Sequence, residues 1–287
     1  MATASQRQIS RAAEPTAFEK QDALLESLRG LDSLLVAFSG GADSAYLAWA
    51  AHRAIGERAL AITALSASFS AHDRKQAEEF VRGTGIRHEF IETREFENPL
   101  YVANNADRCY FCKDELFERM EEIAAERHFS AIAYGVNADD TRDFRPGHRA
   151  AHEHRVLAPL LGAGLHKEEI RLLSREAGLA TWDRPASACL SSRVAYGTPV
   201  SRELLSKIER AEAVLRETGF RQFRVRTHGE KGEVARIELA ADEFERGLDP
   251  KLARHIAAQL KEIGFAFVAL DLEGYRQGSL NSLLKIK

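Results

Sequence analysis

The sequence has few of the features that cross-link a chain or place it in a membrane. Its 287 residues include three cysteines, an odd number and few for this length, which excludes the disulfide scaffold of a small secreted protein. No stretch reaches the ~18 consecutive apolar residues of a membrane span. The polar N-terminus lacks the apolar core of a signal peptide. We therefore expect a reduced, soluble, cytoplasmic protein with no membrane partner.

A strong excess of one charge is also missing. The 40 basic and 43 acidic side chains leave a formal net charge of −3. Proteins that bind nucleic acid over a broad surface are usually basic, so we expect no nucleic-acid partner. The balance still leaves room for a local basic pocket.

Strands and helices alternate over the first half of the sequence. Apolar residues at helical spacing, which favour a helix, occur at residues 17–29, 45–54 and 71–82, and again from about Cys112. Short apolar runs typical of buried parallel strands lie at residues 34–38, 59–65, 87–91 and 131–136. This alternation predicts an α/β fold with a parallel sheet.

The second half has a different pattern. Residues 137–164 predict a long irregular loop with one strand-like pair at 156–157, and a helix at 166–177 precedes a second irregular stretch at 185–199. After an N-cap at Ser201, the sequence predicts strands at 223–227, 234–239 and 265–270 and a helix at 250–263. We therefore divide the chain into a disordered tail at 1–16, a first domain at 17–199 and a smaller C-terminal α+β domain at 200–287.

The segment Ser39–Ser44, with the sequence SGGADS, lies between a predicted buried strand and a helix. Unpaired N–H groups at a helix N-terminus bind anions, and Gly40 and Gly41 let the backbone approach phosphate oxygens. Asp43 is suited to Mg²⁺ beside a phosphate. The chain has neither GxxxxGK[ST] nor GxGxxG. The alternative, a glycine-rich turn without a ligand, explains the polar residues poorly.

A second polar segment follows the fourth predicted strand. Gly135, Asn137 and Asp140 belong to the sequence GVNADD. Loops at the carboxyl edge of a parallel sheet form nucleotide sites, so this segment is expected beside the first. Both segments resemble those of the PP-loop ATP pyrophosphatases, which have a Rossmann-like, adenine nucleotide alpha hydrolase-like fold. These enzymes cleave ATP between the α- and β-phosphates.

The three cysteines allow several interpretations. Cys109 and Cys112 form a CxxC pair, and Cys189 stands far from it in sequence. A redox pair would leave Cys189 without a role, whereas zinc completed by a histidine stays open. Three thiolates without a fourth point to a 4Fe–4S cluster with one open iron, which could hold a sulfide.

Several motifs together resemble one family, the LarE family of ATP-dependent sulfur transferases, which make the nickel-pincer nucleotide cofactor of lactate racemase. The resemblance covers roughly residues 18 to 280. Its motifs are SGGADS at 39–44, RCYFCK at 108–113, DFRPG at 143–147, ACLSSR at 188–193 and FRVRTHG at 223–229.

The resemblance implies a reaction with two steps. With ATP and Mg²⁺, a carboxylate of a pyridinium dicarboxylate mononucleotide is adenylylated, and a sulfur then displaces AMP to give a thiocarboxylate. Members with one cysteine, at the position of Cys189, sacrifice that sulfur. Members with three are thought to use sulfide on a 4Fe–4S cluster, and Cys109, Cys112 and Cys189 match that type.

The resemblance also implies further site residues and partners. Arg224 and Arg226 alternate along a predicted strand and, with Ser192 and Arg193, would bind the substrate phosphate. Glu212 and Glu238 match positions linked to a divalent metal, with Asp242 or Glu243 as the third acid. Taken alone, these residues are typical of a solvated surface. The family also suggests a homo-oligomer, a trimer or hexamer, and transfer of product to a downstream nickel-inserting protein.

Three other functions remain as alternatives. A PP-loop iron–sulfur tRNA thiolase would use the same loop and cysteines, but the chain lacks its additional CxxC pairs and an evident RNA-binding module. A ligase of the NAD or GMP synthetase kind would need no thiols. A non-enzymatic module could sense nucleotide and redox state without releasing pyrophosphate.

Overall fold

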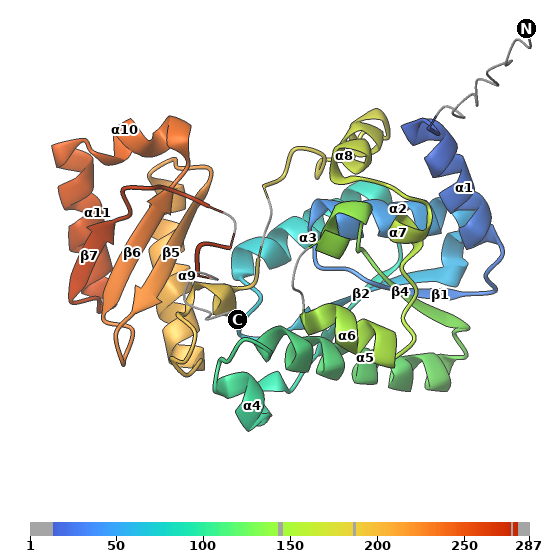
Figure 1. Ribbon diagram of the computed structural model, residues 1–287, viewed down its shortest axis with the longest axis horizontal. Helices are drawn as coiled ribbons and strands as arrows, with labels where there is room; N and C mark the ends of the chain where they lie inside the picture. Colours follow the sequence, from blue (N-terminus) through green and yellow to red (C-terminus); the bar gives the residue numbers. More distant parts are fainter. Residues whose placement is uncertain (1–13, 143–145, 186–187, 277, 281–287) are drawn as a thin grey trace, which may run out of the picture.

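The structure is a computed structural model that describes residues 14–142, 146–185, 188–276 and 278–280. Residues 1–13 of the predicted tail therefore lie outside the described residues. Figure 1 shows a larger and a smaller group of elements, each built around its own sheet. Within the part of the chain that the structure describes, no helix combines the length and the apolar character that crossing a bilayer requires.

Four parallel strands form the larger sheet, in the order β3-β2-β1-β4. Leu34 and Val36 of β1 pack on one face of this sheet, and Leu35 and Ala37 pack on the other. A strand buried on both faces needs apolar residues at consecutive positions, which explains the run in the sequence. The strands are β1 (Leu34–Ala37), β2 (Ala59–Leu65), β3 (His88–Glu92) and β4 (Ala131–Tyr134).

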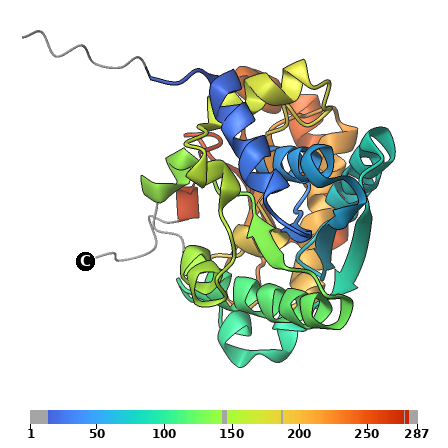
Figure 2. The same ribbon diagram turned by 90° about the vertical axis from the view of Figure 1, so that its right-hand side faces the viewer.

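Helices cover both faces of the larger sheet (Figure 1, Figure 2). One face carries α5 (Arg108–Arg127) and α6 (Pro146–Glu153), and the short α4 (Pro99–Val102) precedes α5. The opposite face carries α1 (Ala17–Arg29), α2 (Ala42–Ile55), α3 (Ala71–Thr84), α7 (Pro159–Gly162) and α8 (Lys167–Glu176). The architecture is the predicted α/β fold, and it is consistent with a PP-loop domain.

The smaller sheet has the order β5-β6-β7, antiparallel between β5 and β6 and parallel between β6 and β7. Its apolar face packs against α9 and α11, whereas Arg224, Arg226 and Glu238 lie on the opposite face, because side chains alternate along a strand. Its elements are α9 (Arg202–Glu217), β5 (Phe223–His228), β6 (Val234–Leu239), α10 (Phe244–Gly247), α11 (Pro250–Ile263) and β7 (Phe267–Leu270).

Most predicted elements are confirmed, including the N-cap at Ser201 and the helix over 250–263. Two predictions are wrong. Residues 137–164 are not one irregular loop, because α6 and α7 lie within them, and Leu157 forms a single bridge to Ala133. Helix α5 begins at Arg108 rather than near Cys112, so the CxxC pair lies inside the helix. Helices α6 and α7 are too short to give a periodic signal, and the first turn of α5 lacks the acidic residues that usually mark the beginning of a helix.

Candidate functional site

The phosphate-type loop has the geometry of an anion site. Gly40 adopts a positive φ of 76°, which favours glycine, and Gly41 is the N-cap of α2 without a side-chain hydrogen bond. Ser44 Oγ accepts from the Ser39 amide at 3.1 Å and donates to the Gly41 carbonyl at 3.1 Å. The two serines thus fix the loop, while the first turn of α2 directs its N–H groups toward a ligand.

The predicted second segment lies against this loop. A Cβ on Gly135 would come within 2.7 Å of the Ser44 amide nitrogen, so only glycine allows β4 to end this close to α2. Asn137 is buried, and its Nδ2 donates to Asp43 Oδ2 at 3.2 Å. The backbone N–H of Asn137 donates to Asp140 Oδ2 at 3.3 Å. Two carboxylates are therefore held by one asparagine beside the loop.

Arg184 contributes a positive charge that the sequence did not reveal. Its Nη1 donates to the carbonyl of Gly40, inside the loop. Burial lowers the pKa of this guanidinium, and the nearby Asp73 partly opposes that shift. The only local signal in the sequence was the Asp-Arg-Pro turn, which says nothing about the long-range contact with residue 40.

The three cysteines occupy two segments. Cys109 and Cys112 lie in the first turns of α5, and Cys189 is the residue before the 3₁₀ turn Leu190–Arg193. Cys109 and Cys189 are exposed, and Cys112 is half-buried. Burial raises the pKa of Cys112, and the charges of Cys189 and Glu95 raise it further. The long sequence separation closes in space, because Arg108, beside Cys109, donates to the carbonyl of Ser191, two residues after Cys189, at 2.8 Å.

Lys113 and Arg108 place positive charge near the thiols. Burial lowers the pKa of Lys113. The negative charges of all three cysteines raise it, but by less, so the pKa is lowered overall. Burial lowers the pKa of Arg108. The charges of Cys189 and Cys109 lead the effects that raise it, and its pKa is raised overall. Even so, among the described residues no group of three or more His, Cys, Asp or Glu side chains is arranged to hold a metal ion. The described residues therefore do not form a preassembled metal site.

Two of the predicted phosphate-binding arginines are paired with the two predicted metal-binding glutamates. Arg193 binds Glu212 through two hydrogen bonds of 2.9 and 3.1 Å, and both side chains are buried. Arg226 contacts Glu238 at 3.0 Å, again with both partners buried. Neither pattern was visible in the sequence, because the partners are 19 and 12 positions apart and meet only in the fold.

Both buried arginines also hold the segment that carries Cys189. Arg193 Nη1 donates to the Cys189 carbonyl at 2.9 Å and to Ser192 Oγ at 3.1 Å. Arg226 Nη1 donates to the Ser192 carbonyl at 2.9 Å. Arg193 therefore links Glu212 of α9, and Arg226 links Glu238 of β6, to the backbone beside the thiol.

The other predicted residues, Arg224, Asp242 and Glu243, are not part of these arginine–glutamate pairs. Arg224 lies with its guanidinium 5.2 Å from the Tyr275 ring centre, and burial followed by the charge of Arg193 lowers its pKa. Glu243 accepts hydrogen bonds from the amides of Arg221 and Gln222 at 2.9 Å, so it closes a turn. Asp242 is exposed.

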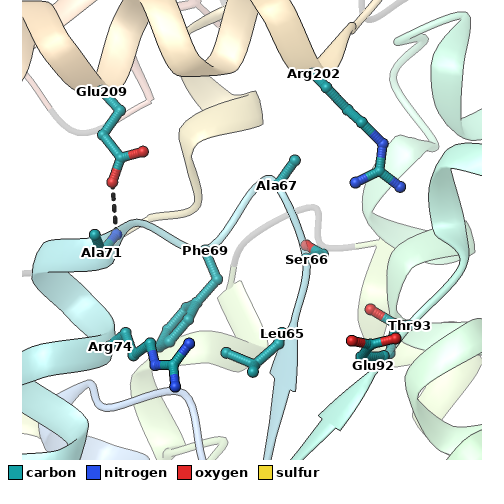
Figure 3. A pocket seen from close by; sticks show the side chains of 10 residues that line it. All are labelled: Leu65, Ser66, Ala67, Phe69, Ala71, Arg74, Glu92, Thr93, Arg202 and Glu209. Atoms are coloured by element: carbon teal, nitrogen blue, oxygen red, sulfur yellow. Dashed lines mark hydrogen bonds between the residues drawn. The ribbon is translucent and has the colours of Figure 1, made fainter.

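A cavity of about 450 Å³ opens at the carboxyl ends of β2 and β3 (Figure 3). Figure 3 shows Arg202 of α9 reaching toward Thr93, with Phe69 and Arg74 on the other side. Glu209 Oε1 accepts from the Ala71 amide at 2.5 Å, which joins α9 to the start of α3. The cavity follows β2, the strand that pairs with β1, and its lining contains no residue of the loop after β1.

Comparison with known proteins gives relatives that cover nearly the whole chain. An uncharacterised protein of Synechocystis sp. is 40% identical over 264 residues, 91% of this chain and 97% of that protein. The pyridinium-3,5-bisthiocarboxylic acid mononucleotide synthase of Lactiplantibacillus plantarum is 32% identical over 267 residues, 92% and 95% of the two chains. An uncharacterised protein of Methanocaldococcus jannaschii is 30% identical over 175 residues, 61% and 66% of the two chains. No family model matches.

Proposed function

The chain belongs to the LarE family of sulfur transferases, and from this premise we propose that it converts a carboxylate of a pyridinium dicarboxylate mononucleotide to a thiocarboxylate at the expense of ATP. Family membership makes it an enzyme of sulfur transfer in nickel-pincer cofactor synthesis. The observation that carries the finer proposal is the contact between the two cysteine segments, where Arg108 beside Cys109 donates to the Ser191 carbonyl at 2.8 Å, two residues after Cys189. A sacrificial mechanism would need only one of these thiols.

The loop at Ser39, Gly40, Gly41 and Ser44 would bind the ATP phosphates through its backbone N–H groups. A substrate carboxylate oxygen attacks the α-phosphorus, and the bond to the bridging oxygen breaks so that pyrophosphate leaves. Arg184 would neutralise charge as it develops on the leaving group. Asp43 and Asp140, with Asn137 between them and Gly135 behind, offer the hard oxygen ligands that suit Mg²⁺. The cavity beside β2 and β3 would take the nucleoside.

Sulfur then attacks the acyl carbon, and AMP leaves with the oxygen of the original carboxylate. The three thiols fit a 4Fe–4S cluster in donor chemistry, because they are soft ligands on two neighbouring segments with cations beside them. They would have to approach one another to hold it. Bound there, such a cluster offers an open iron that can carry sulfide. Lys113 and Arg108 would balance the thiolate charge.

Arg224, Arg226, Ser192 and Arg193 would bind the phosphate of the substrate, as the family resemblance implies. Because Arg193 and Arg226 are already paired with Glu212 and Glu238, we propose that a divalent cation on those carboxylates frees guanidinium N–H groups for the phosphate. Arg224→Ala should then raise the KM for the mononucleotide. We further propose that the protein has two domains that meet near Pro199, assembles as a homo-oligomer and passes its product to a nickel-inserting protein.

The test is a purification without oxygen, followed by iron and acid-labile sulfide analysis and a pyrophosphate-release assay. We expect about four irons per chain and release that requires the pyridinium mononucleotide. A matched Cys109→Ser variant should lose iron while still binding ATP. A protein that takes up only zinc would contradict the cluster, and release that depends on tRNA instead would favour the thiolase alternative. Nucleotide binding without release would favour a sensor.

A further inference from the structure

Asn104 lies in the turn between α4 and α5 and is fully buried. Its φ of 56° is in the left-handed region, which a residue other than glycine adopts only where its surroundings enforce it. Its Nδ2 donates to the carbonyls of Ala195 and Thr198, both at 2.9 Å, and its Oδ1 accepts from Arg108. One side chain therefore ties the start of α5 to the segment that follows Cys189.

Arg108 completes this connection from the helix itself. It is 3% exposed, and its Nη1 also donates to the Ser191 carbonyl at 2.8 Å. Tyr101 adds a hydrogen bond of 2.8 Å between its hydroxyl and Ser191 Oγ. Arg108 immediately precedes Cys109 in the sequence, and Ser191 stands two residues after Cys189. The bonded residues are thus the sequence neighbours of thiols on both segments.

We propose that Asn104 and Arg108 are positioning residues that set the spacing between Cys189 and the two thiols of α5. The proposal rests on the proposed function, which needs all three thiols to act on one sulfur. The two residues are suited to this because they bind main-chain carbonyls of the Cys189 segment: Arg108 Nη1 binds Ser191, and Asn104 Nδ2 binds Ala195 and Thr198. The positions of these carbonyls do not depend on side-chain rotamers. Buried polar groups that lose their hydrogen-bond partners destabilise the protein. Moving the Cys189 segment away from α5 would break several of these buried hydrogen bonds at once and is therefore unfavourable.

The test uses the full-length, metal-free, reduced protein and a short bifunctional thiol alkylator such as dibromobimane. Each thiolate displaces one bromide, and peptide mapping gives the yield of bridges from Cys189 to α5 and of the bridge within the CxxC pair. Asn104→Gly keeps the left-handed backbone but removes the side-chain amide. Arg108→Lys keeps the positive charge but replaces the planar guanidinium. Asn105→Gly, at the exposed neighbouring position, and Arg119→Lys, further along α5, are the matched controls.

We expect either variant to lower the yield of bridges from Cys189 about fivefold, because the effective concentration of the two segments falls. The bridge between Cys109 and Cys112 should not change, since both lie on one helix, and neither control should alter either yield. Lower thermal stability with an unchanged ratio of the two bridges would show a purely structural role and overturn the proposal. So would a wild-type protein that forms no bridge to Cys189.

If Asn104→Gly does not fold, Arg108→Lys decides the outcome. If neither folds, Tyr101→Phe decides it, because that variant removes only the hydroxyl contact with Ser191 and should give a smaller change in the same direction. Since the measurement uses no iron, ATP or mononucleotide, its failure is distinct from failure of the proposed function. A protein that forms the expected bridges but binds no iron would support the positioning role and contradict the proposed cluster.

Discussion

At the scale of single residues, the proposed nucleotide site contains positions where an added atom or a lost charge would act directly on the loop at 39–44. Gly135 leaves room for the Ser44 amide, and Arg184 donates to the Gly40 carbonyl. Neither residue touches a thiol in the described contacts. Changes here should therefore alter ATP binding and leave thiol chemistry intact.

Gly135→Ala tests the close approach. The new Cβ would lie 2.7 Å from the Ser44 nitrogen and 2.8 Å from its Cα, and both are backbone atoms that cannot rotate away. Overpacking of this kind costs about 1–3 kcal/mol, and here it should displace the first turn of α2. We expect a lower melting temperature and ATP affinity reduced at least about tenfold by titration calorimetry. Gly83→Ala in α3, where nothing lies within 4 Å, is the control and should be neutral or slightly stabilising.

Arg184→Ala tests the charge at the loop. Charge-assisted hydrogen bonds to phosphate are worth roughly 1.5–3 kcal/mol, so the KM for ATP should rise by about tenfold or more. The KM for the mononucleotide should stay the same, because the residues proposed for its phosphate lie elsewhere. Arg82→Ala, an exposed residue of α3, is the control. An unchanged KM for ATP would remove Arg184 from the nucleotide site.

At the scale of elements, α6 is fixed to α5 by a histidine between two carboxylates. His154 follows the last turn of α6, and its ring nitrogens lie 3.0 Å from Asp114 and 3.1 Å from Glu121, both on α5. Burial lowers the pKa of His154, but the hydrogen bonds and charges of the two acids outweigh it, so the pKa is raised overall. The position of α6 matters to the site, because Gly147 lies against Lys113.

This pair of contacts predicts a pH dependence of stability. Because the folded pKa lies above the unfolded value of about 6.5, the contribution of His154 is complete below that value and is lost as the pH rises through the folded pKa. His154→Gln should therefore lower the melting temperature more at about pH 5.5 than at about pH 8.5. His152→Gln, at an exposed position of α6, is the control. Thermal unfolding at several pH values measures both, and an equal effect of His154→Gln at all of them would contradict the mechanism.

At the scale of the whole molecule, what the sequence predicted correctly depends on local pattern, and what it missed depends on contacts between distant segments. The strands from 59 to 65 and from 234 to 239 agree residue for residue, because apolar runs and turn residues define them. The pairing of Arg193 with Glu212 brings together a 3₁₀ turn and α9, and the bond from Asn104 to Thr198 spans 94 positions. No periodicity encodes such contacts. The start of α5 was missed because its first turn lacks the acidic residues that usually mark the beginning of a helix.

The arrangement of the whole chain also bears on whether the enzyme survives its own reaction. The carbonyls of the segment that carries Cys189 accept hydrogen bonds from Arg193 within that segment, from Arg226 of the smaller sheet and from Arg108 of α5. These bonds fix the backbone and do not involve the sulfur, so the source of the transferred sulfur decides whether Cys189 stays intact. If sulfide is supplied at a cluster held by Cys109, Cys112 and Cys189, the cysteine side chains remain intact.

With ATP, Mg²⁺, the mononucleotide and added sulfide, we therefore expect more than one thiocarboxylate per chain. The intact mass of the cluster-free protein after reaction should equal its mass before it. Mass spectrometry with peptide mapping of residues 188–193 measures this, and Cys109→Ser is the control that should abolish turnover without changing the mass. A single thiocarboxylate per chain, with Cys189 converted to dehydroalanine, would show instead that Cys189 alone supplies the sulfur and that the two thiols of α5 serve another purpose.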